Sequence, residues 1–237
     1  MSSGGTASAD GRLYVLDSDG HGDADPRRVG IKAANLMRMA DAGLAVPSGF
    51  VLGVDVCADY HAAGERVGED VIELIGVGLA HIEQRTGRRF AARRRPLLVS
   101  VRSGAAASMP GMLDTVLNVG LCEVTVPALL RATGDPIFVW DSYRRLIETY
   151  AEVVEGCPVA PFSAVTTRAL RRAGVPVASE LGLAALQEIV EELLAIFREE
   201  ARREFPQDPM QQLLGAIEGC CGPGTPRARS PTAGSRA

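Results

Sequence analysis

The apolar positions of the chain fall into short continuous runs and longer stretches with helical spacing. Short runs bounded by Gly, Pro and Asp predict strands at residues 13–16, 50–54 and 97–101. Apolar residues that recur every three to four positions predict helices at 33–42, 56–63, 69–85, 141–154 and 184–203, and Asp208-Pro209 predicts the start of another. Residues 157–177 contain three prolines, and we expect them to be irregular around 164–172. This order predicts a mixed α/β fold whose C-terminal half is rich in helices.

The two ends of the chain differ from the rest. Residues 1–11 are rich in Ser, Gly and Ala and lack the basic start and apolar core of a secretory signal, so we expect them to be disordered. Residues 219–237 lose all periodicity, and we expect a disordered tail there. A shift of the reading frame after Glu218 would explain the abrupt change and predicts that the tail packs against nothing. A native disordered tail is the alternative, and in both cases residues 12–218 form the folded domain.

The composition of the chain indicates which kinds of partner it binds and in which cellular compartment it lies. The chain of 237 residues carries a net charge of -4, and none of its apolar runs reaches the roughly 18 uncharged residues that span a membrane. Residues 85–95 hold six arginines, but Phe90 is the one aromatic among them. We therefore favour a solvated loop over a nucleic-acid patch and expect neither a nucleic-acid nor a membrane partner. The five cysteines are odd in number and form no CxxC pair, so we expect no disulfide scaffold, no zinc ribbon and a cytoplasmic location.

A single lysine stands out among the basic residues. Of the 25 Lys and Arg residues, Lys32 alone is lysine, and it lies at a predicted helix start in V-G-I-K-A-A-N-L. The free N–H groups and dipole of a helix N-terminus suit a phosphate, as does a lysine ammonium. The segment lacks the GxxxxGK[ST] pattern of a Walker A loop. A surface lysine retained by chance is the alternative.

A second segment places an arginine at the end of a buried strand. The strand at 97–101 leads directly into Arg102, and small residues follow from Ser103 to Pro110. Such a loop lets backbone N–H groups approach a polyphosphate closely. The alternative is a plain connection that carries a surface arginine.

These residues resemble a known family. Residues 99–121, V-S-V-R-S-G-A-A-A-S-M-P-G-M-L-D-T-V-L-N-V-G-L, are similar to the nucleotide-binding domain of pyruvate, phosphate dikinases, whose pattern is VSVRSGAxxSMPGMMDTxLNLGL. Residues 30–50 resemble the family's GGKGANLAEMxxLGLPVPPGF, and residues 141–147 its DSYRRFI. Residues 205–217 resemble FPxDPxEQLxxAI, so the resemblance runs colinearly over about residues 12–218.

The resemblance implies a fold, an activity and a set of site residues. It implies the first part of an ATP-grasp-like domain, which passes the β-phosphoryl group of ATP to a histidine on a separate domain. The full-length family converts ATP, phosphate and pyruvate to AMP, diphosphate and phosphoenolpyruvate, with Mg²⁺ bound with the nucleotide. By motif match, Lys32 and Arg102 contact the phosphates, and we expect both to point into one cleft. The remaining nucleotide-binding residues implied are Ser103, Gly104, Ser108, Met109, Gly111, Asp114 and Thr115.

The chain also departs from the family pattern. Ile31 and Ala33 replace glycines beside the lysine, and none of His21, His61 and His81 lies in the family's phosphohistidine motif, TSHA. The resemblance places the metal-binding acids of the second lobe outside this sequence. We therefore expect the ATP-binding portion of a dikinase-like phosphotransferase that is inactive alone. The alternatives are a non-catalytic nucleotide-binding remnant and a subunit completed by a separately encoded phosphohistidine or pyruvate-binding protein.

Overall fold

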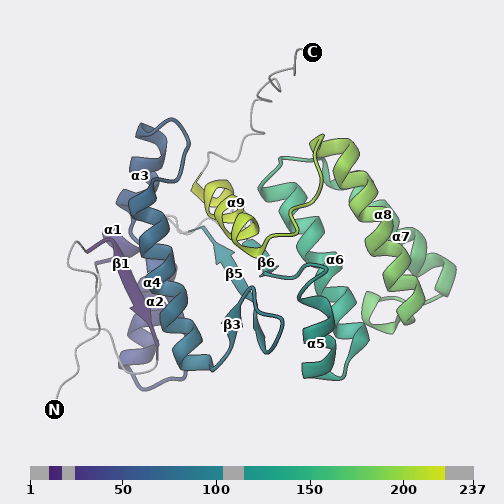
Figure 1. Cartoon of the computed structure of the whole chain (residues 1–237), viewed down its shortest axis with the longest axis horizontal. Helices are drawn as coiled ribbons and strands as arrows, with labels where there is room; N and C mark the ends of the chain where they lie inside the picture. Colours follow the sequence, from purple (N-terminus) through teal and green to yellow (C-terminus); the bar gives the residue numbers. More distant parts are fainter. Residues whose placement is uncertain (1–10, 18–24, 104–114, 222–237) are drawn as a thin grey trace.

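The chain forms an N-terminal α/β unit, a central strand ribbon and a C-terminal group of helices, arranged from left to right in Figure 1. The computed structural model describes residues 11–17, 25–103 and 115–221. Along these residues the strands are β1 (Leu13–Leu16), β2 (Gly49–Leu52), β3 (Arg89–Phe90), β4 (Pro96–Leu97), β5 (Val99–Arg102) and β6 (Thr115–Val119). The helices there are α1 (Pro26–Val29), α2 (Ile31–Asp41), α3 (Val54–Ala62), α4 (Glu69–Thr86), α5 (Val126–Thr133), α6 (Pro136–Val153), α7 (Val159–Ala173), α8 (Leu183–Ala201) and α9 (Pro209–Cys221), with a 3-10 helix η1 (Ala178–Glu180). None of the described helices has the length and apolar character needed to cross a membrane.

The N-terminal unit is built on the antiparallel pair β1–β2. Ala34 and Met37 of α2 lie one helical turn apart, and both pack with Leu16 and Val29 in a small apolar cluster. Helix α4 packs against both strands. The β1–β2 pair is therefore covered by α2, which precedes β2 in the sequence, and by α4, which follows it.

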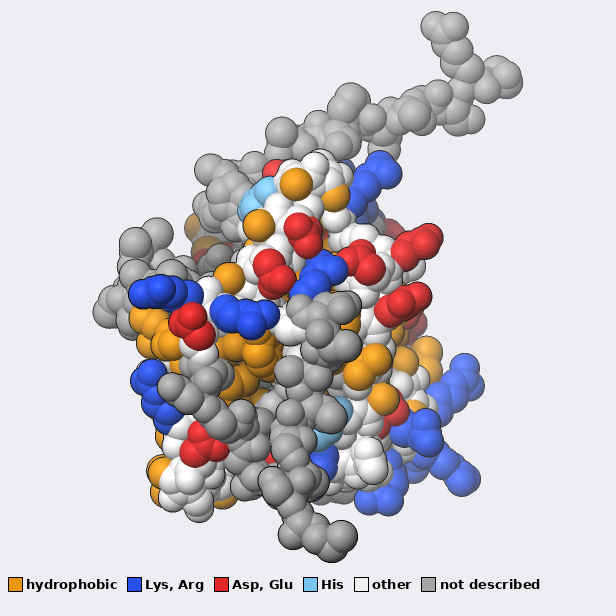
Figure 2. All heavy atoms as spheres, turned by 90° about the vertical axis from the view of Figure 1, so that its left-hand side faces the viewer, with side chains coloured by type: hydrophobic (Ala, Val, Ile, Leu, Met, Phe, Trp, Pro, Cys, Tyr) orange, Lys and Arg blue, Asp and Glu red, His pale blue; other side chains and the backbone are white. Residues whose placement is uncertain are grey.

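An arginine just before β1 ties this strand to two helices. The Arg12 guanidinium lies 2.8 Å from the Asp59 carboxylate of α3 and 2.5 Å from the Asp70 carboxylate of α4. The hydrogen bond from Arg12 lowers the pKa of Asp70. Both carboxylates are exposed, so the cluster orients the strand and adds little to the free energy of unfolding. Figure 2 shows this side of the molecule, where acidic and basic side chains are interspersed with exposed apolar ones.

The central ribbon is the antiparallel pair β5–β6, and it contains a bulge. Val99 pairs with Val119 and Val101 with Val116, so β6 carries one residue more than β5 between these pairs. Asn118, within this irregularity, adopts a φ of 58° and donates a side-chain hydrogen bond of 3.2 Å to the Ser142 carbonyl of α6. The bulge thus attaches the ribbon to α6.

Helix α6 lies at the centre of the C-terminal group. It packs against α5, α7, α8, α9 and β6. Beside it, the Phe205 ring lies edge-on to Tyr143, Tyr150 and Phe197, with ring centroids 6.2, 5.4 and 5.2 Å apart. Edge-to-face contacts of this kind add to the stabilisation from burial alone. This aromatic cluster joins α6 and α8 to the segment that leads into α9.

The sequence pattern located many of these elements. The strand at 13–16 and the helices at 33–42, 56–63, 69–85 and 184–203 are confirmed within two residues at each end, and α9 begins at Pro209. Every described element after β6 is helical, which confirms the helix-rich C-terminal half. The mixed α/β class is confirmed, whereas the ATP-grasp-like assignment stays a prediction.

Three parts of the expectation need correction. Residues 164–172 are not irregular but lie inside α7, because its prolines stand before the helix and in its first turn, where the backbone N–H has no helical partner. Helix α6 begins five residues earlier than predicted, after Asp135, which accepts a 2.9 Å hydrogen bond from the Phe138 N–H. Strand β6 and helix α5 were not predicted, since runs of only five and eight residues give a weak sequence signal.

The C-terminal expectation is partly overturned. Helix α9 crosses the boundary placed after Glu218 and ends at Cys221. A Cβ at Gly219 would lie 2.9 Å from the Val153 carbonyl oxygen, so this residue contacts α6 closely. The expectation that the tail packs against nothing is therefore wrong for residues 219–221. Residues 222–237 and 1–10 lie outside the described part.

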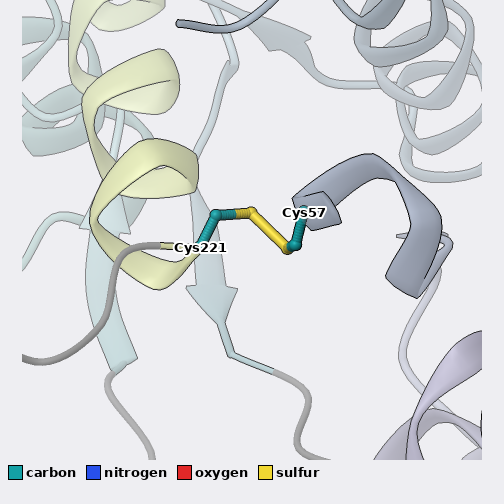
Figure 3. The surroundings of a disulfide bond; sticks show 2 residues. All are labelled: Cys57 and Cys221. Atoms are coloured by element: carbon teal, nitrogen blue, oxygen red, sulfur yellow. A yellow bond between two sulfur atoms is a disulfide. The ribbon is translucent and has the colours of Figure 1, made fainter. Parts of the chain in front are cut away.

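One disulfide joins distant parts of the fold. Cys57 of α3 is bonded to Cys221 at the end of α9, with their Cα atoms 5.2 Å apart (Figure 3). The cysteine count predicted no disulfide scaffold, and this bond was missed because 164 residues of sequence separate the pair. Cys122, Cys157 and Cys220 form no disulfide in the described structure.

We predict a specific alkaline pH dependence of stability from Tyr143. Burial is the main cause that raises the pKa of Tyr143 to about 12. The unfolded phenol ionises near pH 10, so the folded state is favoured below that pH and loses this advantage as pH rises toward 12. The free energy of unfolding should fall by about 1 kcal/mol per pH unit between pH 10 and 12.

Urea unfolding of wild type and Tyr143→Phe across this range measures the effect. The variant should lack this part of the decline, whereas parallel curves for the two proteins would contradict the assignment to Tyr143.

Candidate functional site

Lys32 lies at the N-terminus of α2, where the backbone has free donors. It is the second residue of the helix, after Gly30, whose φ of 81° and ψ of 154° favour a residue without a Cβ. The apolar stripe of α2 faces the β1–β2 pair, which leaves Lys32 exposed on another face. The structure therefore confirms that Lys32 lies at a helix start. The helix itself begins at Ile31, two residues earlier than predicted.

Arg102 lies at the exposed end of β5. Val99 and Val101 pack against the core, while Ser100 and Arg102 are exposed, as the alternation of a strand requires. Across the ribbon, Arg102 pairs with Thr115, and Ser103 follows it directly. Three residues of the predicted site thus meet at one end of one ribbon.

The other predicted site residues fall outside the described part of the chain. Gly104, Ser108, Met109, Gly111 and Asp114 all lie within residues 104–114. Their placement over the phosphates stays a prediction.

Lys32 and Arg102 come from different structural units. Among the described residues, neither side chain makes a hydrogen bond or an ion pair, and both are exposed. Two cavities of the described structure lie elsewhere: one is near Cys221 and the other is a cleft of about 310 Å³ between α6 and α7. The expected common cleft for the two cations therefore stays a prediction.

A buried glutamine that the sequence reasoning missed holds the ribbon in place. Gln212 of α9 is fully buried, and its side-chain oxygen accepts a 2.9 Å hydrogen bond from the Gly120 N–H at the end of β6. Its side-chain nitrogen donates to the carbonyls of Leu121 and Pro206, at 2.9 and 2.7 Å. The signal was available, because Gln212 is a polar residue within the apolar stripe of a predicted helix.

The described residues offer no evident cation site. They contain no group of three or more His, Cys, Asp or Glu side chains that could hold a metal ion. What the arrangement offers chemically is positive charge: a lysine ammonium beside free helix N–H groups, and an arginine guanidinium at a strand end.

We predict that Gln212 contributes far more to the free energy of unfolding than its sequence neighbour Gln211. Replacement by leucine would leave the Gly120 N–H and two carbonyls without partners, at roughly 1–3 kcal/mol for each buried group left unpaired. We expect Gln212→Leu to lower the free energy of unfolding by at least about 3 kcal/mol.

Exposed Gln211 provides the matched control for this experiment. Gln211→Leu should change the free energy of unfolding, measured by urea titration, by less than about 0.5 kcal/mol. Equal effects of the two substitutions would show that the hydrogen bonds of Gln212 do not hold the ribbon.

Comparison with known proteins gives a consistent set of relatives. No protein-family model matches the chain. It is 38% identical over 199 residues to pyruvate, phosphate dikinase of Clostridium symbiosum, which covers 83% of this chain and 23% of the relative. It is 43% identical over 190 residues to the chloroplastic pyruvate, phosphate dikinase 1 of Arabidopsis thaliana, covering 80% and 20%. For the Rhizobium meliloti (strain 1021) enzyme of that name, the values are 43% over 197 residues, 83% and 22%. The chain thus spans about a fifth of the length of these curated relatives.

Proposed function

Because the chain is a relative of the pyruvate, phosphate dikinases over about four fifths of its length, we propose that it binds ATP as the nucleotide-binding portion of a dikinase-type phosphotransferase. The observation that carries this proposal is the position of Arg102. It stands exposed at the end of β5, on the segment whose sequence most resembles the family's phosphate-binding motif. A guanidinium there can form charge-assisted hydrogen bonds to phosphate oxygens.

Lys32 supplies the second cation of the proposed site. Its helix begins at Ile31, and the N-cap residue Gly30 has no side chain to cap it, so the first N–H groups of α2 are available to an anion. An ammonium next to these donors adds positive charge and, because its stem is flexible, can approach the anion from a direction that the N–H groups leave open. In this proposal, Lys32 and Arg102 hold and orient the polyphosphate of ATP.

Magnesium enters the proposal only with the nucleotide. The described residues do not form a carboxylate set for Mg²⁺, so we assign it no protein ligand among them and derive no step from it. When bound to ATP, the ion would neutralise phosphate charge. The contribution of this chain is the positioning of the phosphates.

The phosphoryl acceptor is proposed to lie outside this chain. The reaction proposed for the complete system converts ATP, phosphate and pyruvate to AMP, diphosphate and phosphoenolpyruvate through a histidine. Of the described histidines, His81 lies 3.4 Å from Asp17 and His61 packs its ring on Tyr60. We therefore propose that a histidine-bearing partner or domain receives the phosphoryl group.

We predict that either cation contributes measurably to ATP binding. Loss of one charge-assisted phosphate contact costs roughly 1.5–3 kcal/mol. Lys32→Ala and Arg102→Ala should therefore each weaken ATP binding by about 10-fold to 150-fold, measured by calorimetric titration with MgATP.

Exposed Arg94 precedes β4 and provides the matched charge control. Arg94→Ala should leave the affinity unchanged within about 2-fold. If the parent chain binds MgATP and both site variants bind it equally well, the assignment of Lys32 and Arg102 fails.

We predict that the chain alone does not turn over. Without an acceptor histidine, purified protein given ATP, phosphate and pyruvate should form no AMP above the level of a protein-free blank. In a second assay, a protein of the same family that carries the acceptor histidine is added to the chain, and AMP formation is measured again. Steady AMP formation by the chain alone would overturn the proposal that the acceptor lies elsewhere.

A further inference from the structure

Two cysteines that are 164 residues apart in the sequence lie within bonding distance of each other. Cys57 lies on α3 and Cys221 is the last residue of α9, with Cα atoms 5.2 Å apart, inside the range that a disulfide requires (Figure 3). Both residues are half-buried, so small thiol reagents can approach them. Adjacent Cys220 faces a different direction around the helix, because successive helical residues are about 100° apart.

Beside this bond, α3 and α9 meet through the buried side chains of Val56 and Ile217, but the packing between them is incomplete. A cavity of about 80 Å³ lies beside the bond, lined by Val56 and Tyr60 of α3, Val71 of α4, and Ile217 of α9. Apolar side chains that do not fill the space between helices contribute less packing energy. On the side that faces α3, the sulfur–sulfur bond therefore supplements incomplete packing, while on the other side Gly219 packs closely on α6.

The bond connects the two units that carry the proposed phosphate ligands. Helix α3 packs on α1, which leads directly into the helix of Lys32. Helix α9 packs on β5 and β6, and its Gln212 anchors the end of β6 on the ribbon of Arg102. A restraint on the distance between α3 and α9 is thus a restraint between the Lys32 unit and the Arg102 ribbon.

We propose that Cys57 and Cys221 form a reversible redox site that locks α9 against α3 and thereby restrains the ribbon that carries Arg102. Its consequence for nucleotide binding rests on the proposed function. The reaction is thiol–disulfide exchange with a small disulfide oxidant. One protein thiolate attacks the oxidant and expels a thiolate, and the second protein thiolate attacks the mixed disulfide and expels another. Two protein thiols and one small disulfide give one protein disulfide and two small thiols.

Oxidation stiffens the fold and pre-forms the site. A cross-link between residues 164 positions apart strongly reduces the conformational entropy of the unfolded chain. In the folded state it limits the motion of α9, so less ordering remains to be done when a phosphate binds. The oxidised form therefore binds ATP more tightly than the reduced form.

The first experiment tests the bond itself. The full chain is equilibrated in glutathione buffers of increasing oxidised fraction, alkylated, and weighed by mass spectrometry before and after reduction. Wild type and the control Cys220→Ser should each lose two alkylation sites and gain about 5–10 °C in Tm on oxidation. Cys57→Ser and Cys221→Ser should show neither change. Peptide mapping that finds Cys57 bonded to Cys220, or no bond at any ratio, overturns the proposal.

The second experiment tests the coupling to the ribbon. Hydrogen exchange of residues 115–121 should slow at least about 3-fold in oxidised wild type and remain constant in Cys57→Ser under the same buffers. MgATP affinity should rise at least about 3-fold on oxidation of wild type alone. If exchange does not respond, the coupling is refuted. If exchange responds but neither form binds MgATP, the proposed function fails while the redox coupling stands.

Discussion

Each of the three sheets in the described structure has only two strands, and an isolated two-stranded sheet is marginally stable in water. The whole architecture follows from this constraint, because every strand pair must be held by helices. The β1–β2 pair is covered by α2 and α4. The β5–β6 pair packs against α9 and α6. Gln212 of α9 adds hydrogen bonds at the end of β6, and the bulge residue Asn118 bonds to α6. The helices therefore act as the frame, and the strands carry exposed positions at their ends.

This division places the proposed phosphate ligand Arg102 at the end of a strand. Strand alternation turns Val99 and Val101 toward the core and leaves Arg102 exposed at the end of the ribbon. At the opposite end of the ribbon, Gln212 of α9 satisfies the Gly120 N–H and the Leu121 carbonyl. Under the proposed function, phosphate binding at Arg102 and the packing of α9 would be linked through the ribbon, without contact between α9 and the ligand.

The sequence predicted what depends on neighbours along the chain. Helical spacing located α4 and α8 closely, and Asp208-Pro209 marked the start of α9. It failed where the determining partner is distant: β6 is a strand because β5 pairs with it, and Gln212 is tolerated in a core because Gly120, 92 residues away, needs a hydrogen bond. The disulfide belongs to the same class, since no local pattern relates Cys57 to Cys221. Of the site, the positions of Lys32 at a helix start and Arg102 at a strand end followed from local pattern, whereas their spatial relation did not.

Under the proposed function, the chemistry of the two cations differs in a way that would account for the single lysine. At the start of α2, backbone N–H groups already point toward any anion that binds there, and their directions are fixed by the helix. A planar guanidinium would have to share the same oxygens in its own plane, whereas an ammonium on a flexible stem adds charge from any direction. At the end of β5, an extended strand offers no comparable set of free donors, so a forked guanidinium supplies both charge and geometry. If both positions bind phosphate as proposed, the helix start favours lysine and the strand end favours arginine. Lys32 is then the position at which a chain with 24 arginines would be expected to keep a lysine.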